Sequence, residues 1–527
     1  MEKMNDNHPW SESALQPPAT PAEPAATFCA GRKEWIYGLL ALICGMMLCN
    51  FVLYGGFQLG FAIAMCAYIL CAAGYLLASG AKLSVYSGLL LGLSLVIAAG
   101  FGRSDDGFVK FVMTCFLAVS VNLGLCLMAG QNRRCPDRAS SLADAGRTVF
   151  TMGYGQLSGG MGGLFRSFKL KGTVAKTLGS VAVGLLILLP VLGIVVSLLV
   201  EADAAFESLI DCIPEFQMDE TLVTVIVGFC VFCVLYTRAV ALIRMKPAEP
   251  VVKDRKGINK ITMNTALIGL SLVYLLYLVS QLAYFVSGFA GIVPKGYSMA
   301  EYARRGFFEM AWLCAINMGL IALAVSLVRK TGEKAPLSTR LLCLFVGLVT
   351  LFLVAVASAK MLTYIRGYGL TRLRVMTQLI IIFFGLMAVT VSVSLFVKKP
   401  RYMPVLLIGA LLLGGSAFWA DVDTVVAAYN VHAYQTGRLE TVDVYYLWEL
   451  GSGAVPQIAK LVDDENPDVA KAAQWALNRS GSYWEDFRSW NYADWCARAY
   501  VTEARETNQE RGHAFPNAMR YLGCTEK

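Results

Sequence analysis

The sequence predicts an all-α, polytopic integral membrane protein: a bundle of about eleven transmembrane helices with a small all-α extramembrane domain at the C-terminus. Three observations predict this class. Of the 527 residues, 57% are hydrophobic and only 16% are charged, whereas a soluble domain carries about 25% charged residues. The mean hydropathy is +0.57. Apolar runs long enough to cross about 30 Å of hydrocarbon recur along the chain. Soluble enzymes, disordered chains and collagen-like chains are therefore excluded for most of its length.

The first 34 residues differ from the rest of the chain. They are polar, rich in Pro and Ala (QPPATPAEPAA) and contain no apolar core. A segment of this composition cannot bury enough apolar surface to fold, and it lacks the apolar stretch of a signal peptide. We therefore expect residues 1–34 to form a disordered N-terminal tail.

Apolar runs that could span a bilayer begin at residue 35. We expect eleven transmembrane helices, at residues 35–54, 57–78, 83–101, 108–129, 177–200, 221–243, 261–288, 303–328, 341–362, 373–397 and 402–420. The first four form an N-terminal membrane segment over residues 35–130. The other seven form the main membrane domain over residues 177–420.

A basic connector over residues 131–176 separates these two parts. Its glycine-rich stretch, GYGQLSGGMGG at 153–163, lacks the G-x-x-x-x-G-K-S/T spacing of a phosphate-binding loop and follows no β-type run. We interpret this stretch as a flexible interfacial connector. Arg166, Lys169 and Lys171 either set the topology alone or also attract anionic lipid headgroups.

The distribution of basic residues among the connectors predicts the orientation. With a cytoplasmic N-terminus, the inside segments hold 25 Lys and Arg residues before the C-terminal region, and the outside segments hold nine. The loop at 201–220 has seven acidic residues and no basic one, which suits the outside. The positive-inside rule therefore predicts a plasma-membrane protein with its N-terminus in the cytoplasm and its C-terminus outside. The same asymmetry explains the net charge of +8, and we expect no nucleic-acid partner.

A few polar residues lie within the apolar runs. Asn122, Gln281, Asn317 and Gln378 are expected to form hydrogen bonds between helices. Arg238 lies toward the inner end of its run, and we expect its side chain to extend to the headgroups. Most of the 15 cysteines also lie in apolar runs, where a thiol behaves as a small hydrophobic group. No metal, nucleotide or nucleophile motif is present, so we assign no cofactor, no metal ligand and no catalytic residue.

Residues 421–527 have a different composition, with more charged and aromatic side chains. The stretch AVPQIAKLVDDENPDVAKAAQWAL shows helical periodicity on both sides of an Asn-Pro pair. Two short amphipathic helices around a proline-containing turn resemble one unit of a HEAT-type repeat. A single unit cannot bury a repeat core. We therefore predict only a small all-α extracytoplasmic domain, which could bind a protein partner.

The most informative membrane segment is PKGYSMAEYARRGFFEMAWLCAIN, residues 294–317. Ser298 and Glu301 have the spacing of a capping box, which predicts a helix start near Met299. On that helix Glu301, Arg305 and Glu309 share one face. Glu309 lies about one turn inside the apolar run, where a carboxylate needs a partner or water. It is either one member of a structural pair with Arg305 or part of a functional site.

Several other basic residues are predicted at the same outer level, although the outside should be poor in cations. We hypothesise that this layer binds an anionic solute or a lipid headgroup. The candidate ligand-binding residues are Arg304, Arg305, Glu309, Lys360, Arg366 and Arg374. Arg372 begins the same run as Arg374, and Asp421 and Asp423 follow the last run, so pairing with these acids is an alternative. Scattered interfacial anchoring of the basic side chains is another.

The segment YARRGFFE at 302–309 resembles the Y-A-R-x-G-F-F-E motif of an uncharacterised family of bacterial multi-spanning membrane proteins, the domain of unknown function 4173, which is related to the domain of unknown function 4153. YLLYLVSQLAYF (274–285), KMLTYIRGYGLTRLRV (360–375) and YNVHAYQTGRLETVDVYYLWELGSGAVPQI (429–458) are similar to the family pattern in order and spacing. The resemblance covers about residues 170–460. It places family positions at Tyr302, Arg304, Gly306, Glu309, Tyr368, Gly369, Thr371, Arg374, Tyr429 and Asn430. It implies a location and an architecture, and no activity.

Three hypotheses of function remain open from the sequence. The first is a carrier or binding protein that accepts an anionic solute or lipid headgroup from the outer face, and it is modestly preferred. The second is a non-catalytic envelope or signalling component whose domain at 421–527 binds a protein partner. The third is an enzyme on a lipid-linked substrate with Glu309 as acid or base, which no other motif supports.

Overall fold

The computed structural model describes residues 29–132, 140–167, 220–245, 258–289, 307–328, 335–397, 401–481 and 486–511, together with seven separate residues between 177 and 199. Over these residues the fold is all-α. The described part contains no β-strand, and one isolated bridge pairs Ile258 with Val328. The predicted fold class is therefore confirmed.

Ten helices of the described part are long and apolar enough to cross a membrane. They are α1 (Arg32–Gly55), α2 (Leu59–Ala78), α3 with the short helix η1 (Val85–Gly102), α4 (Gly107–Met128), α9 (Glu220–Arg244), α10 (Lys260–Phe289), α12 (Phe307–Leu327), α13 (Leu337–Tyr368), α14 (Arg372–Ser394) and α15 (Tyr402–Ala420). Each corresponds to a predicted run. The predicted run at 177–200 lies outside the described residues except for seven positions.

Local signals explain where several of these helices begin. Ser84 accepts a hydrogen bond from the backbone of Ser87 and so caps α3. Asp106 Oδ1 accepts from the backbone N–H groups of Phe108 and Val109 and so caps α4. Thr371 caps α14 through the backbone N–H of Arg374. These side chains satisfy backbone donors that have no partner within the helix.

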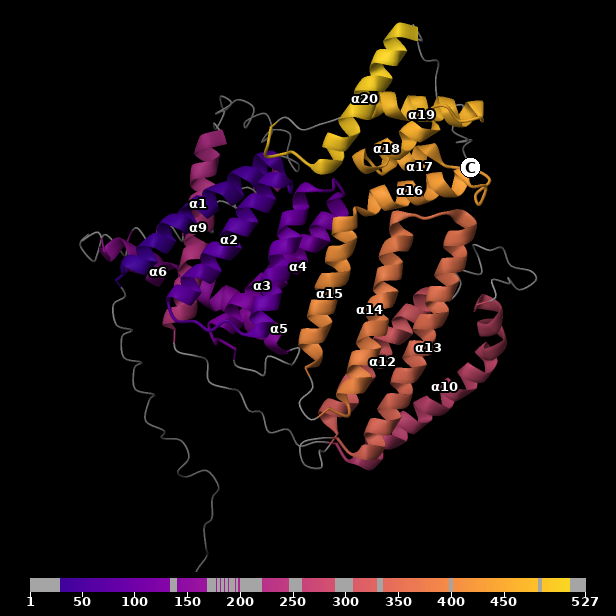
Figure 1. Cartoon of the computed structure of the whole chain (residues 1–527). Helices are drawn as coiled ribbons and strands as arrows, with labels where there is room; N and C mark the ends of the chain where they lie inside the picture. Colours follow the sequence, from indigo (N-terminus) through magenta and orange to yellow (C-terminus); the bar gives the residue numbers. More distant parts are fainter. Residues whose placement is uncertain are drawn as a thin grey trace, which may run out of the picture.

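The membrane helices form two hydrophobic bundles. Bundle A combines α1–α4 with α9, and bundle B combines α10, α12, α13 and α14. Figure 1 shows α15 between the two bundles. It packs on α14 of bundle B and on α3 and α4 of bundle A, and its buried Leu411 and Phe418 belong to the core of bundle A.

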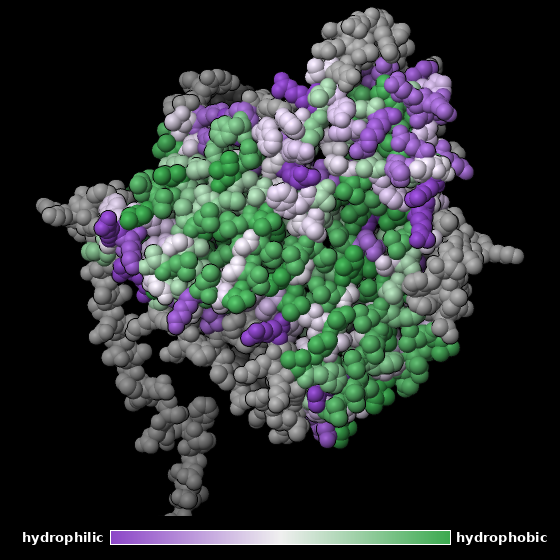
Figure 2. Space-filling model, in the orientation of Figure 1, coloured by the Kyte–Doolittle hydropathy of each residue, from purple (hydrophilic) through white to green (hydrophobic). Residues whose placement is uncertain are grey.

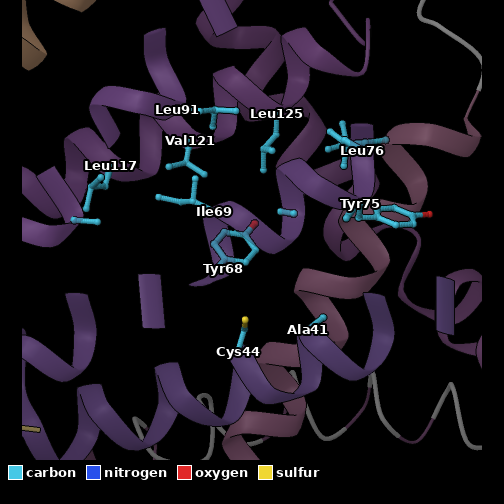
Figure 3. Packing of buried hydrophobic residues seen from close by; sticks show 14 of the residues in the cluster. Ala41, Cys44, Tyr68, Ile69, Tyr75, Leu76, Leu91, Leu117, Val121 and Leu125 are labelled. Carbon is cyan, nitrogen blue, oxygen red and sulfur yellow. The ribbon is translucent and has the colours of Figure 1, made fainter. Parts of the chain in front are cut away.

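Bundle A is held together by close helix approach and by stacked rings. A Cβ at Gly45 of α1 would lie 2.7 Å from the carbonyl oxygen of Gly228 on α9, so only glycine permits this distance. Tyr37 stacks on Tyr75 with ring centroids 4.5 Å apart. Figure 3 shows Tyr68 in the interior of this bundle, among side chains of α1, α2, α3 and α4.

Bundle B contains two polar contacts between helices. Asn317 of α12 accepts a hydrogen bond from the Tyr274 hydroxyl and donates to Thr350 at 3.0 Å. Gln378 of α14 donates to Ser358 of α13 at 2.6 Å. The predicted interhelical role is confirmed for Asn317 and Gln378. The side-chain amide of Asn122 instead donates to a carbonyl of its own helix, and the Gln281 side chain lies outside the described residues.

The described part of the glycine-rich connector, residues 140–167, is helical, which corrects the prediction of a flexible stretch at 153–163. It contains α5 (Ser140–Thr148), the π-helix η2 (Val149–Tyr154) and α6 (Leu157–Ser167). Buried Met152 and Met161 join the core of bundle A. A Cβ at Gly160 would lie 2.8 Å from the Thr237 side chain, so the glycines allow this segment to pack directly on α9.

The C-terminal domain has its own hydrophobic core. Its elements are α16 (Val422–Gln435), α17 (Val444–Glu449), η3 (Ser452–Ala454), α18 (Val455–Ile458), η4 (Ala459–Leu461), α19 (Pro467–Arg479) and α20 (Tyr492–Arg511). Asn466 caps α19, and Pro467 occupies its first turn. Figure 2 shows hydrophilic residues gathered on this domain and hydrophobic residues over the bundles. The domain covers one end of the bundles, which we call the domain-side end; the opposite end is the far end.

Candidate functional site

An ion-pair centre with two buried carboxylates joins both bundles to the C-terminal domain. Arg372, the first residue of α14, donates from Nε to Asp423 Oδ1 at 2.8 Å and from Nη2 to Asp423 Oδ2 at 2.9 Å. The same Nε lies 3.0 Å from Asp106 Oδ2. Asp106 precedes α4 of bundle A, Arg372 begins α14 of bundle B, and Asp423 lies in α16 of the domain. The Arg372 guanidinium of bundle B therefore contacts both bundle A and the domain.

A second charged residue, Lys110, lies one turn into α4 and is only 4% exposed. Its ammonium donates to Gln58 Oε1, and Gln58 Nε2 donates to Asp105 Oδ1 at 2.8 Å. Lys110 interacts electrostatically with four carboxylates, those of Asp105, Asp106, Asp421 and Asp494. A lone ammonium at this depth would be costly, and these carboxylates offset that cost.

The carboxylates of the domain are also hydrogen-bonded. Asp421 has a φ of 55°, and its Oδ2 accepts from the Thr424 hydroxyl at 2.6 Å. Asp494 accepts from Asn491 at 2.7 Å and from the Ser452 hydroxyl. Burial raises the pKa of Asp421 and of Asp494. Burial likewise raises the pKa of Asp423 to about 6, against the opposing effect of the Arg372 guanidinium.

We call this set of residues the junction: Arg103, Asp105, Asp106, Lys110, Arg372, Asp421, Asp423 and Asp494. Its five carboxylates outnumber its three basic groups, so the junction does not attract anions. Within the described part of the chain, no group of three or more His, Cys, Asp or Glu residues could hold a metal ion. What the arrangement can do is hold three parts of the molecule together.

A second contact between the domain and bundle A lies at the same end. Arg488 of the domain donates to Asn50 Oδ1 at 3.2 Å and to Glu220 Oε2 at 3.1 Å. The backbone N–H of Gly60 donates to the Arg488 carbonyl at 3.1 Å. A Cβ at Gly55 would lie 2.6 Å from the Arg488 side chain. The domain therefore contacts α1, α2 and α9 independently of the junction.

The predicted ligand-binding residues have different environments. Lys360 is half-buried on α13, and Arg366 is exposed near the end of that helix. Arg374 donates to the carbonyls of Tyr368 and Gly369 and lies 4.0 Å over the Tyr364 ring, so it closes the C-terminus of α13. Arg304, Arg305 and the side chain of Glu309 lie outside the described residues. The shared layer therefore stays a prediction.

The family-motif positions of the described part meet at one loop. Gly369 has a φ of 75°, and a Cβ there would lie 2.6 Å from Asn430 Oδ1. Asn430 Oδ1 accepts from the N–H of Leu370, and Thr371 caps the next helix. Tyr368 and Tyr429 flank these residues in the sequence, whereas Tyr302 and Gly306 lie outside the described residues. These positions build the loop between α13 and α14 and dock it on α16.

Sequence reasoning placed Arg372, Asp421 and Asp423 at one level but missed several junction residues. The sequence pattern does not indicate Asp106 or Asp494, and it places Lys110 only among the outside charges. One signal was available: Lys110 is a basic residue inside an apolar run, at the end where basic residues should be rare. No sequence signal pairs it with a domain more than 300 residues away.

Comparison with known proteins gives one match. A family model described as "Domain of unknown function (DUF4153)" matches residues 40–461. The match begins far closer to the N-terminus than the resemblance over 170–460 and includes α1–α4. No curated protein matches the chain, and no solved structure matches it.

Proposed function

The chain belongs to the DUF4153 family, and from this membership and the geometry of the junction we propose that it is a multi-pass membrane protein whose bundles hold the C-terminal domain in a fixed position for a protein partner. The second hypothesis from the sequence thus gains support over the first. We further propose, on the motif at 302–309, a kinship with the related 4173 family.

The observation that carries this proposal is the three-way contact of Arg372. The Asp106 and Asp423 side chains are 3% and 4% exposed, and both face the same guanidinium. The Arg372 side chain is 35% exposed, but the two carboxylates are buried, and a shift of the domain would leave a buried carboxylate without its cation. The Arg488 contact fixes the other side of the domain. These two contacts support a role in positioning the domain better than a role in binding a diffusing anion.

The partner surface we propose is an aromatic cluster on the domain. Tyr445, Trp448 and Trp475 lie with ring centroids 5.3–6.4 Å apart. Arg479 lies 5.8 Å over the Trp475 ring. Tyr445 is 37% exposed, and the two tryptophans pack partly on the domain core. Rigid aromatic side chains with an adjacent arginine are enriched at the energetic centres of protein interfaces.

We propose that this surface lies outside the cytoplasm. The support is the excess of basic residues in the connectors of the far end, which favours the cytoplasm for that end. The membrane is then the plasma membrane, the N-terminus is cytoplasmic, and the domain faces the extracytoplasmic space.

Site-specific photo-crosslinking in living cells tests the proposal. A photoreactive amino acid replaces Tyr445 in the full-length chain, and a matched control replaces Leu276, which is 74% exposed on α10. We expect a discrete protein adduct from position 445 and only lipid adducts from position 276. The adduct should weaken in Arg372→Ala, which removes the contact of the domain with α14 and α4. No adduct at position 445, or an unchanged one in Arg372→Ala, contradicts the proposal.

A second candidate function is the binding of an anionic solute or lipid headgroup by Arg304, Arg305, Glu309, Lys360 and Arg366. The observation that favours it is the exposed position of Arg366 in the last turn of α13. Neutralising Glu309 or Arg366 should then abolish binding while membrane abundance stays unchanged. If ligand binding survives both substitutions, this candidate fails.

A further inference from the structure

The far end of bundle A contains a buried arginine that the junction does not use. Arg238 lies on α9 and is only 5% exposed. It precedes Arg244, the end of that helix, by six residues, or about 9 Å along the axis. The sequence predicts that its side chain reaches the headgroups. The structure corrects this prediction, because the guanidinium points into the bundle toward α2 and α4.

The hydrogen bonds of Arg238 are few and long. Nη1 lies 3.5 Å from the Tyr68 hydroxyl, and Nη2 lies 3.4 Å from the backbone carbonyl of Asn122. Nε is buried and has no hydrogen-bond partner. None of the ion pairs given for the described residues includes Arg238. A guanidinium has five donors and normally binds at 2.7–3.2 Å, so most of its capacity is unused.

A buried charge in this state is expensive. Burying an ion without a good partner costs several kcal/mol, and ionisable groups within membrane segments are retained mainly where they are functional. The nearby charges are Asp144 and Arg147 of α5, which share with Arg238 the electrostatic environment of Cys126.

The segment that covers Arg238 is the glycine-rich one. A Cβ at Gly153 of the π-helix η2 would lie 3.9 Å from the Arg238 side chain, and Gly160 of α6 packs against Thr237. π-Helical turns are rare and recur at functional sites. The connector that contains this segment, residues 131–176, carries eight basic and two acidic residues, a balance that gathers anionic groups at a membrane surface.

We propose that Arg238 and the Tyr68 hydroxyl form a binding site for a phosphate oxyanion at the far end of bundle A, beneath α5, η2 and α6. Arginine matches this ligand because its planar fork donates two parallel hydrogen bonds to phosphate oxygens. Tyr68 accepts from Arg238 and keeps its own proton to donate. Figure 3 shows the Tyr68 ring within the bundle, with Cys44 and Ala41 on one side and Val121 and Leu125 on the other. The phosphate is that of a lipid headgroup or of a free anion.

Thermal unfolding of the full-length protein distinguishes these sources. In neutral detergent, sodium phosphate is compared with sodium chloride at equal ionic strength. In nanodiscs, phosphatidylglycerol is compared with digalactosyldiacylglycerol, which contains no phosphate. Stabilisation by phosphate in detergent assigns a free anion. Stabilisation only by phosphatidylglycerol assigns a lipid headgroup.

Variants identify the residues responsible. If the ligand is free phosphate, Arg238→Gln should raise the phosphate concentration for half-maximal stabilisation at least tenfold. If the ligand is a lipid headgroup, Arg238→Gln should abolish the stabilisation by phosphatidylglycerol. Lys82→Gln, an exposed basic residue in the turn between α2 and α3, should respond like the wild type. Two milder variants replace Arg238→Gln in the test if that variant does not fold. Tyr68→Phe keeps the packing and Arg238→Lys keeps the charge, and both should bind phosphate more weakly than the wild type. The proposal is overturned if both of these variants respond like the wild type. It is also overturned if the wild type shows no response, or if Lys82→Gln loses as much of the response as Arg238→Gln does.

Discussion

The side-chain amide of Asn430 bonds both backbone groups of Leu370: Oδ1 accepts from the N–H, and Nδ2 donates to the carbonyl, each at 2.7 Å. This pair of bonds docks the loop between α13 and α14 on the first helix of the C-terminal domain. It requires Gly369, because a Cβ there would lie 2.6 Å from Asn430 Oδ1.

Gly369→Ala is therefore expected to destabilise the protein. The change adds strain at a positive φ and a clash with Asn430, which together cost about 1–3 kcal/mol. Gly437→Ala is a matched control, because Gly437 also has a positive φ (70°) but has open space around its Cβ position. Thermal unfolding in detergent should show a larger loss for Gly369→Ala. Equal losses would show that the contact with Asn430 does not matter.

The junction predicts a coupled effect of Arg372 and Asp423. Arg372→Ala leaves two buried carboxylates without their cation and should lower the free energy of unfolding by roughly 2–4 kcal/mol. Asp423→Asn alone should cost less, because an amide still accepts hydrogen bonds. The two effects should not add in the double variant. Denaturant unfolding of the three variants measures this coupling, and strict additivity would exclude it.

The pKa of Asp423 predicts a dependence of stability on pH. Burial raises this pKa to about 6, whereas an aspartate in an unfolded chain titrates near 3.9. Between these values the folded chain binds a proton that the unfolded chain does not. The contribution of Asp423 to stability is thus complete below about pH 4 and is lost as the pH rises through about 6.

Comparison with Asp423→Asn isolates this effect from other titrating groups. The charged and titratable groups that act on Asp423 or on its partner Arg372 are Arg372 itself, Asp106, Asp421 and Tyr446. Unfolding temperatures between pH 4.5 and 7 should fall more steeply with pH in the wild type than in Asp423→Asn. Parallel curves for the two proteins would contradict the raised pKa.

Asn317 predicts a polar contribution to the packing of bundle B. Asn317→Leu removes its hydrogen bonds to Tyr274 on α10 and Thr350 on α13. Bonds of this kind contribute about 0.6–2 kcal/mol in membrane proteins. Asn122→Leu serves as a control, since the Asn122 amide bonds only within its own helix. Unfolding in detergent should show a clear loss for the first variant and a smaller one for the second.

The proposed orientation predicts which cysteines an impermeant reagent reaches. Arg438→Cys lies in an exposed loop of the domain, and Lys82→Cys lies in an exposed turn at the far end. On intact cells an impermeant maleimide should label position 438 above the wild-type background and leave position 82 unlabelled. Permeabilised cells should show both labels. Labelling of position 82 in intact cells would reverse the orientation.

Apolar runs of spanning length predicted most of the helices but less of their surroundings, and the predicted capping box at Ser298 and Glu301 lies outside the described residues. Asp106, Ser84 and Asn466 cap helices where their residue types indicate a start. The glycine-rich stretch at 153–163 was wrongly interpreted as flexible, because glycine weakens an isolated helix. In the structure glycine permits close packing on α9, and that packing outweighs the low propensity.

The sequence by itself determined that this is a multi-pass helical membrane protein, because a backbone in hydrocarbon must satisfy its own hydrogen bonds and each span needs about 20 apolar residues. Only the tertiary structure decided which side chains meet. Arg372 contacts Asp106 and Asp423, and the Arg238 side chain points into bundle A. These contacts depend on how each helix is rotated against its neighbours, and small residues at the helix contacts set that rotation.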